Sequence, residues 1–142
     1  MPACLGLDYG LRRIGVAACD AESSLAFAVD THVEGRDGSV FALIDRLVNE
    51  RNIQTIVVGL PLTAAGEEAD LALKARGFGE KLAAKFAVNI VMWDERYSSQ
   101  EADGWLRQAR RTTREDRDTL AAEIILQSYL DSLQAETAED DT

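Results

Sequence analysis

Short apolar or alternating runs dominate the beginning of the chain and predict β-strands. The runs lie around Leu5 and Leu7, from Arg13 to Cys19 and from Leu25 to His32, and glycine and polar turns separate them. Consecutive short strands with turn residues between them are typical of an antiparallel meander. We therefore expect three strands in succession at the start of the fold.

Helical spacing replaces this pattern after residue 39. Apolar residues recur at helical spacing up to Asn52, and again from Leu71 to Phe86. Two apolar strands, Thr55–Val58 and Val88–Trp93, follow these helices in alternation, and Gly59 stops the first of them. A strand without a polar side is typical of a parallel strand covered on both faces. The middle of the chain is thus expected to alternate helix and strand.

Two further helices are expected in the last third of the chain. Ser98 and Glu101 form a capping-box pattern before an apolar stripe, and a second stripe runs from Ala121 to Tyr129. The order of elements predicts an α/β fold, a mixed five-stranded sheet with an antiparallel meander followed by parallel strands, flanked by helices. We assign residues 1–133 to a single domain and 134–142 to a disordered acidic tail.

Length and composition agree with one compact domain. The chain has 142 residues, 46% of them hydrophobic, which is too few for two ordinary domains. Because no apolar run approaches the ~20 residues of a membrane span and no signal peptide is evident, we expect a soluble, cytoplasmic protein with no membrane partner. Cys4 and Cys19 have no Cys or His neighbour at a metal-ligand spacing, so we expect buried free thiols.

The formal charge of −10 at first argues against a nucleic-acid partner. Several of the acids, however, lie in the last seven residues, whereas basic residues cluster in one short stretch. The cluster contains Arg107, Arg110, Arg111, Arg114 and Arg117. Because local field matters more than net charge, this segment is a candidate for tracking a nucleic-acid backbone, and a solvated helix end is the competing interpretation.

Carboxylates at three places in the chain are candidates for chemistry. Asp8 ends the first strand, Asp94 and Glu95 follow the last one, and Asp118 precedes the final apolar stripe. Each has an ordinary explanation as a turn residue, an ion-pair partner or a first-turn helix residue. Asp94 and Glu95 point to opposite faces, so at most one of them joins Asp8, and periodicity does not choose between them.

Convergence of three carboxylates on one sheet would require a compensating cation. Two charges ~5 Å apart repel by roughly 3 kcal/mol at an effective dielectric constant near 20. Three such pairs would offset most of the net stability of a fold, which is only ~5 to 15 kcal/mol. Oxygen ligands without Cys or His favour Mg²⁺ or Mn²⁺.

Several motifs together resemble the YqgF/RuvX family, and the resemblance covers nearly the whole chain up to the acidic tail. The motifs are Leu5-Gly6-Leu7-Asp8-Tyr9-Gly10, Arg13-Ile14-Gly15-Val16-Ala17, Val57-Val58-Gly59-Leu60-Pro61-Leu62, Asp94-Glu95-Arg96, and Asp118-x-x-Ala121-Ala122 followed by Ile125-Leu126-Gln127-Ser128-Tyr129-Leu130. The family has a ribonuclease H-like fold and is described as Holliday junction resolvases and as nucleases that mature the 5′ end of 16S ribosomal RNA.

This resemblance implies that Asp8, Glu95 and Asp118 form the catalytic and metal-binding set. It thereby selects Glu95 over Asp94 by analogy. The corresponding chemistry is phosphodiester hydrolysis by two Mg²⁺ or Mn²⁺ ions ~3.5 to 4 Å apart. We expect Asp8 to be the bridging ligand because it ends a central strand, with Glu95 and Asp118 each completing one side.

Arginines are the candidate contacts to nucleic acid. They are Arg12, Arg13 and Arg96 near the carboxylates, and Arg107, Arg110, Arg111 and Arg114 in the basic segment. Solvated charges that neutralise the acids are the alternative for the first three.

The expected function is that of an endonuclease acting on precursor 16S ribosomal RNA or the pre-ribosome, as a monomer or homodimer. A resolvase of branched DNA is the alternative within the same chemistry. A non-catalytic nucleic-acid-binding or transcription-associated factor is the alternative from another class. An actin-like kinase lobe would share the order of the first elements, but that architecture needs two such lobes.

Overall fold

The computed structural model describes residues 3–33, 39–62, 65–66, 68–98 and 114–140. Strands β1 (Cys4–Tyr9), β2 (Arg13–Cys19) and β3 (Phe27–Val33) come first, and helix α1 (Ser39–Arg51) follows them. Strand β4 (Thr55–Leu60), helix α2 (Asp70–Lys85), strand β5 (Asn89–Asp94), the 3₁₀ turn η1 (Glu95–Ser98) and helix α4 (Arg114–Asp140) complete the described part. The predicted helix after Ser98 lies outside the described residues.

The five described strands form one mixed sheet in the order β3-β2-β1-β4-β5. β2 is antiparallel to β1 and to β3, whereas β4 is parallel to both β1 and β5. The predicted meander followed by parallel strands is confirmed. β1 lies in the middle of the sheet with a hydrogen-bonded neighbour on each side, so its backbone is held more firmly than that of an edge strand.

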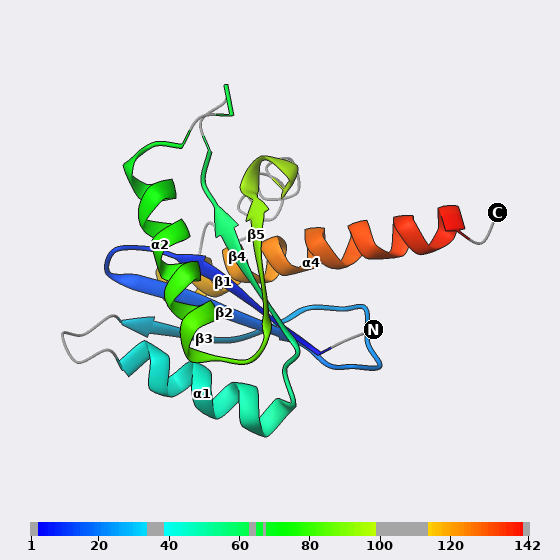
Figure 1. Cartoon of the computed structure of the whole chain (residues 1–142), viewed down its shortest axis with the longest axis horizontal. Helices are drawn as coiled ribbons and strands as arrows, with labels where there is room; N and C mark the ends of the chain where they lie inside the picture. The colour runs from blue at the N-terminus through cyan, green and yellow to red at the C-terminus, as the bar shows by residue number, and fades with distance from the viewer. Residues whose placement is uncertain (1–2, 34–38, 63–64, 67, 99–113, 141–142) are drawn as a thin grey trace.

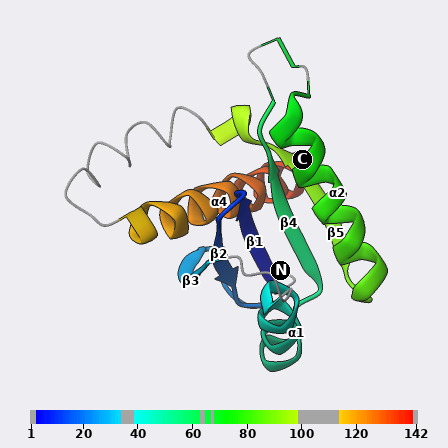
Figure 2. The same cartoon turned by 90° about the vertical axis from the view of Figure 1, so that its left-hand side faces the viewer.

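Helices cover both faces of the sheet (Figures 1 and 2). Helices α1 and α2 lie on one face, where Leu5, Leu7, Ile56 and Val58 belong to the larger core cluster. Helix α4 lies on the other face against the alternate residues of the same strands, including Cys4 and Val57. Every residue of β4 is buried, as its apolar sequence predicts for a central parallel strand.

Small residues allow α4 to pack directly against β1. A Cβ atom built on Gly6 would lie 2.6 Å from the Leu126 Cβ and 3.0 Å from the Ala122 carbonyl oxygen. The helix backbone therefore occupies the space that a side chain at position 6 would need. This contact sets the separation between α4 and the strand that carries Asp8.

The side chain of Gln127 fixes α4 to the segment between β2 and β3. Its Oε1 accepts a hydrogen bond from the Ala26 N–H at 2.9 Å, and its Nε2 donates to the Ser24 carbonyl at 2.9 Å. Nearby, the Trp93 indole N–H donates to the Ser128 hydroxyl at 3.2 Å. Helix α4 is thus anchored to the β2–β3 connection and to β5, and Trp93 packs against the core.

Cys4 and Cys19 are cross-strand neighbours on the α4 face of the sheet. They are paired residues of β1 and β2, both are buried, and both are free thiols. Burial raises the pKa of Cys4 to about 11 and also raises that of Cys19. The expectation of buried hydrophobic cysteines without a disulfide is confirmed.

Helix α4 continues to Asp140, beyond the expected end of the ordered chain. Its backbone is helical through residues 134–140, which the sequence pattern assigned to a disordered tail, so position 133 is not a boundary of secondary structure. Ala135, Glu136 and Ala138 favour helix and permit this continuation. None of the described helices has an apolar stretch long enough to cross a membrane.

Substituting Gly6 with Ala should destabilise the protein, because the new methyl group meets the helix backbone and not a movable side-chain end. We expect a loss of about 2 kcal/mol in the free energy of unfolding, measured by urea denaturation. Gly77→Ala is the matched control: a Cβ there meets nothing within 4 Å, and alanine should stabilise α2 by about 1 kcal/mol. Equal effects of the two substitutions would contradict the packing described here.

Candidate active site

Asp8 lies near the end of β1 and on the face covered by α4. Cys4 belongs to the α4-side core, and the Cβ position of Gly6 is directed at Leu126. Because strand side chains alternate, Asp8 shares this face. It is only partly buried, so its carboxylate lies where the covered surface of the sheet opens.

Glu95 reaches the same face from the other side of β4. Val91 and Trp93 of β5 pack in the α4-side core, and Glu95 continues their alternation. Met92, by contrast, packs on the α2 side against Ala72 and Ala75. The register of the sheet therefore gives a structural reason for Glu95, rather than Asp94, to face Asp8, a choice that periodicity alone left open.

Gly59 provides the space in which Glu95 lies. Leu7 pairs with Val58 and Gly59 pairs with Trp93, so Gly59 lies between the ends of β1 and β5. A Cβ on Gly59 would be 2.6 Å from the Glu95 Oε1 and 2.6 Å from the Ile125 Cδ1. The carboxyl group of Glu95 thus lies directly over the glycine. The sequence pattern identified Gly59 only as the residue that stops an apolar strand, and this glycine was the available signal for the site.

A hydrogen bond joins the carboxyl groups of Asp8 and Glu95. An ionised carboxylate only accepts hydrogen bonds. Two carboxylates in contact therefore need a shared proton, or a cation in the place of that proton. Burial raises the pKa of Glu95, the hydrogen bond with Asp8 opposes that rise, and the charge of Asp94 adds to it. Two acidic groups brought together from separate elements therefore create a place where positive charge is stabilised.

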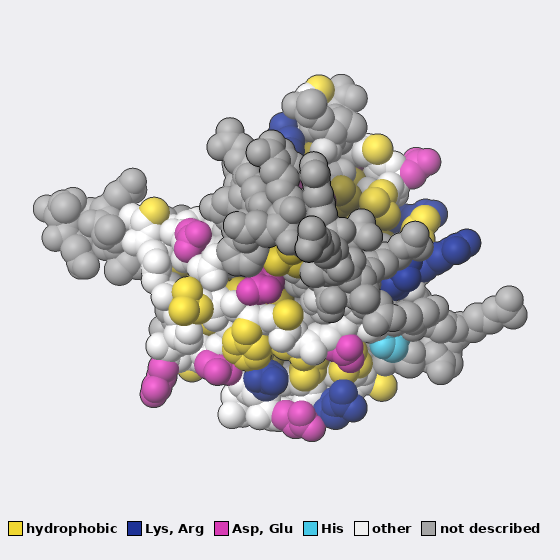
Figure 3. Space-filling model, turned by 180° about the vertical axis from the view of Figure 1, so that it is seen from behind, with side chains coloured by type: hydrophobic (Ala, Val, Ile, Leu, Met, Phe, Trp, Pro, Cys, Tyr) yellow, Lys and Arg dark blue, Asp and Glu magenta, His cyan; other side chains and the backbone are white. Residues whose placement is uncertain are grey.

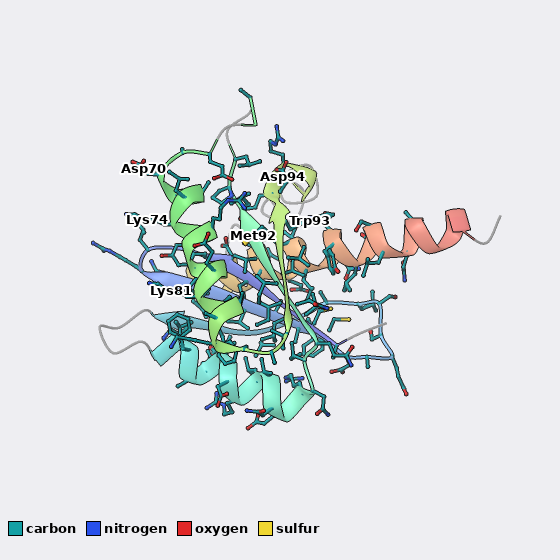
Figure 4. The ribbon with its side chains drawn as sticks, viewed as in Figure 1. Asp70, Lys74, Lys81, Met92, Trp93 and Asp94 are labelled. Carbon is teal, nitrogen blue, oxygen red and sulfur yellow. The ribbon has the colours of Figure 1, made fainter. Side chains whose placement is uncertain are left out.

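Asp94 and Arg96 form a clasp around Glu95. The Asp94 Oδ1 accepts a hydrogen bond from the backbone N–H of Arg96 at 2.9 Å, and the Arg96 guanidinium donates to Oδ2 at 2.6 Å. These bonds hold the pKa of Asp94 below its usual range. Figure 4 shows Asp94 at the end of β5, where the chain enters η1. These bonds close the backbone turn that contains Glu95 and so restrict the direction of the Glu95 side chain.

The loop after β4 lies beside the Arg96 guanidinium. A Cβ on Gly66, whose φ is +82°, would lie 3.2 Å from the Arg96 Nη1. This left-handed backbone conformation favours glycine. In the same loop Glu68 accepts hydrogen bonds from the Arg76 guanidinium of α2. Arg96, predicted as a nucleic-acid contact, is thus already engaged with Asp94 and packed on this loop.

The remaining predicted site residues are described only in part. Asp118 lies in α4, one helical turn before Ala122, but its side chain is not among those described. Arg12 is exposed in the turn after β1, and Arg13 begins β2. Arg114 begins α4 without a described side chain, and Arg107, Arg110 and Arg111 lie outside the described residues. Within the described part of the chain, no third metal-ligating side chain joins Asp8 and Glu95.

Comparison with known proteins identifies the family. A family model described as "RuvX: Holliday junction resolvase" matches residues 2–132. The chain belongs to the RuvX family. A relative from Synechocystis sp. named "Putative pre-16S rRNA nuclease" is 42% identical over 132 residues, which are 91% of this chain and 87% of that protein. A relative of the same name from Chloroflexus aggregans is 42% identical over 131 residues, covering 90% and 92% of the two chains.

Solved structures share the fold of this RuvX protein at low identity. "T. thermophilus RuvC in complex with Holliday junction substrate" has a TM-score of 0.65 and 15% identity, covering 95% of this chain and 97% of that one. "Thermus thermophilus RuvC structure" has a TM-score of 0.57 and 13% identity, covering 94% and 96%. The predicted ribonuclease H-like fold is confirmed by this likeness.

Substituting Gly59 with Ala should disturb the site more than the fold. The new methyl group meets the flexible ends of Glu95 and Ile125, so we expect a cost of only about 1 kcal/mol in unfolding free energy. Displacing Glu95 by about 1 Å should lower the rate of nuclease cleavage by about 100-fold. Urea denaturation and a cleavage assay on the same preparation separate the two effects. Full activity of Gly59→Ala would contradict this role of the glycine.

Substituting Asp94 should reveal whether the clasp positions Glu95. Asp94→Ala removes both acceptors for Arg96 and should lower kcat about tenfold or more, because Glu95 loses its fixed direction. Asp94→Asn keeps the Oδ1 that accepts the Arg96 backbone N–H and should restore much of the rate. The measurement is kcat and KM for both variants. Equal losses in the two would indicate that the charge of Asp94, and not the turn, is what matters.

Proposed function

We propose that this RuvX protein is a divalent-metal-dependent endonuclease that hydrolyses phosphodiester bonds in structured nucleic acid, with precursor 16S ribosomal RNA as its substrate. The contact between the carboxyl groups of Asp8 and Glu95 is the observation that carries the proposal. The substrate assignment is supported by the names of relatives that are 42% identical over most of the chain.

The donor set fits Mg²⁺ or Mn²⁺. Asp8 and Glu95 offer hard oxygen ligands from two rigid elements, with Gly59 leaving room between them. Asp118 is proposed as the third ligand, since its backbone position is one turn before Ala122, on the helix that packs against β1. When bound, the ions supply activation of a water molecule and stabilisation of charge on the phosphate and leaving oxygens.

The protein's own groups then orient the substrate and hold the ligands in place. Asp8 would be the most rigidly held of the metal ligands, because its strand has a paired neighbour on each side. Glu95 is held by its position over Gly59 and by the clasp of its two neighbours. Arg12 and Arg13, in and after the turn that follows β1, and the segment 107–114 are proposed to hold phosphate oxygens of the substrate.

Branched DNA is the second candidate substrate. The description of the matching family as Holliday junction resolvase supports it. The same carboxylates would serve either substrate. A direct comparison of the two substrates under identical conditions is therefore part of the test.

Asp8→Asn and Glu95→Gln should each abolish cleavage while leaving the fold intact. We expect the rate in Mn²⁺ to fall by at least about 1,000-fold, since the loss removes a ligand and a charge. Each amide is the same size as the acid and can still form the hydrogen bond between positions 8 and 95. The assay compares cleavage of a precursor 16S fragment with that of a four-way DNA junction.

Thermal unfolding with and without Mn²⁺ is the matching control. A ligand that binds only the folded state raises the melting temperature. The wild type should show this rise, whereas Asp8→Asn should not, although the two should melt alike in EDTA. Cleavage that survives Asp8→Asn would overturn the proposed mechanism, and nucleic-acid binding without any turnover would favour the non-catalytic alternative.

A further inference from the structure

We infer that one side of helix α2 is part of the nucleic-acid-binding surface, an inference that rests on the proposed nuclease function and extends its substrate contacts. The surface consists of Lys74 and Lys81 with Gly77 between them, and we call it the lysine flank. No motif in the sequence singled out these residues, because they lie on a helix whose predicted role was to cover the sheet.

Helical geometry places the two lysines on the same side of α2. They are seven residues apart, which is two turns, and both are exposed. Figure 4 shows both leaving the same side of the helix. A Cβ on Gly77 would meet nothing within 4 Å, so the surface between the lysines is open. An extended chain of phosphates can therefore approach the helix closely between two positive charges.

Aromatic packing places the lysine flank beside the end of β1. Phe78 packs against Tyr9 with ring centroids 5.0 Å apart, and Tyr9 directly follows Asp8. Phe78 also contacts Phe41 of α1. Lys74 and Lys81 lie on the side of α2 that adjoins Phe78, and this side is therefore near the end of β1. Figure 2 shows the end of β1 between the first turns of α4 and helix α2.

Positive charge gathers at this edge of the molecule. The turn between β1 and β2 carries the exposed Arg12. In the space-filling view, Lys and Arg side chains gather along the right-hand edge, where the β1–β2 turn and α2 lie (Figure 3). Among the residues that the structure describes, neither Lys74 nor Lys81 forms an ion pair. Asp70, one turn before Lys74, marks the end of the flank.

The other basic residues of α2 have structural partners. Arg76 binds Glu68, and the Lys85 ammonium lies over the Phe41 ring at 5.0 Å. Lys74 and Lys81 are thus distinguished from their neighbours by having no such partner among the described side chains. Lysine contacts to phosphate add affinity without reading sequence, so the flank should bind RNA and DNA backbones alike.

A salt titration of binding tests the inference. The probe is a fluorescein-labelled RNA hairpin, and anisotropy is measured in EDTA so that cleavage does not interfere. The double variant Lys74→Gln/Lys81→Gln should bind severalfold more weakly than wild type. The slope of log K against log salt should become shallower by about 1.5, because each lost phosphate contact contributes roughly 0.7 to 0.9.

Two controls distinguish a local phosphate contact at the lysine flank from an effect of the protein's net charge and from an effect of side-chain size. Arg46→Gln removes one positive charge from α1, as each lysine substitution does from α2. It should leave both the affinity and the salt slope unchanged. Gly77→Glu places a carboxylate between the lysines and should weaken binding, whereas Gly77→Gln, of equal size, should bind more tightly than Gly77→Glu. Urea denaturation confirms that each variant is folded.

The outcomes distinguish this inference from the proposed function. If the wild type cleaves RNA and the double lysine variant binds RNA with unchanged affinity and salt slope, the inference about the lysine flank is wrong and the nuclease proposal stands. If Arg46→Gln lowers the affinity as much per charge removed as the lysine substitutions do, the effect comes from net charge and the inference also fails. If the wild type neither binds nor cleaves, both proposals are overturned.

Discussion

The close approach of α4 to the centre of the sheet depends on two glycines and determines the geometry of the site. Gly6 on β1 leaves room for Leu126 and Ala122, and Gly59 on β4 leaves room for Ile125 and the carboxyl group of Glu95. Because protein interiors are densely packed, a methyl group at position 6 would meet the backbone of α4, and one at position 59 would displace the ends of Glu95 and Ile125. The missing side chains of Gly6 and Gly59 therefore let α4 pack close to the sheet and leave the space between the ends of β1 and β5.

Charge is distributed around this point in a way that net charge conceals. The chain carries −10 overall, yet Asp8 and Glu95 face α4, while Arg12 and the lysine flank lie around the end of β1. Acidic groups close together favour a cation, and basic groups around them favour a polyanion. A phosphodiester substrate with a divalent ion satisfies both requirements at once, which neither charge pattern indicates alone.

Much of the fold was predictable from apolar spacing, and the site only in part. The strands and the first two helices follow from periods of two and 3.6 residues. The choice between Asp94 and Glu95 did not, because it depends on which face of β5 packs on α4, and both faces are apolar. The space over Gly59 depends on contacts between distant segments, and so does the position of the lysine flank beside the end of β1, which follows from the packing of Phe78 on Tyr9. The helical continuation to Asp140 departs from the expected tail because helix propensity acts even in a strongly acidic stretch.

The buried cross-strand thiols have a practical consequence for studying this molecule. Alkylating reagents attack the thiolate, and burial keeps Cys4 and Cys19 protonated and inaccessible at neutral pH. A cysteine introduced at an exposed position, such as that of Leu11 in the β1–β2 turn, would react far faster than either. Dyes or spin labels can thus be attached to the native background, without replacing two residues of a tightly packed core.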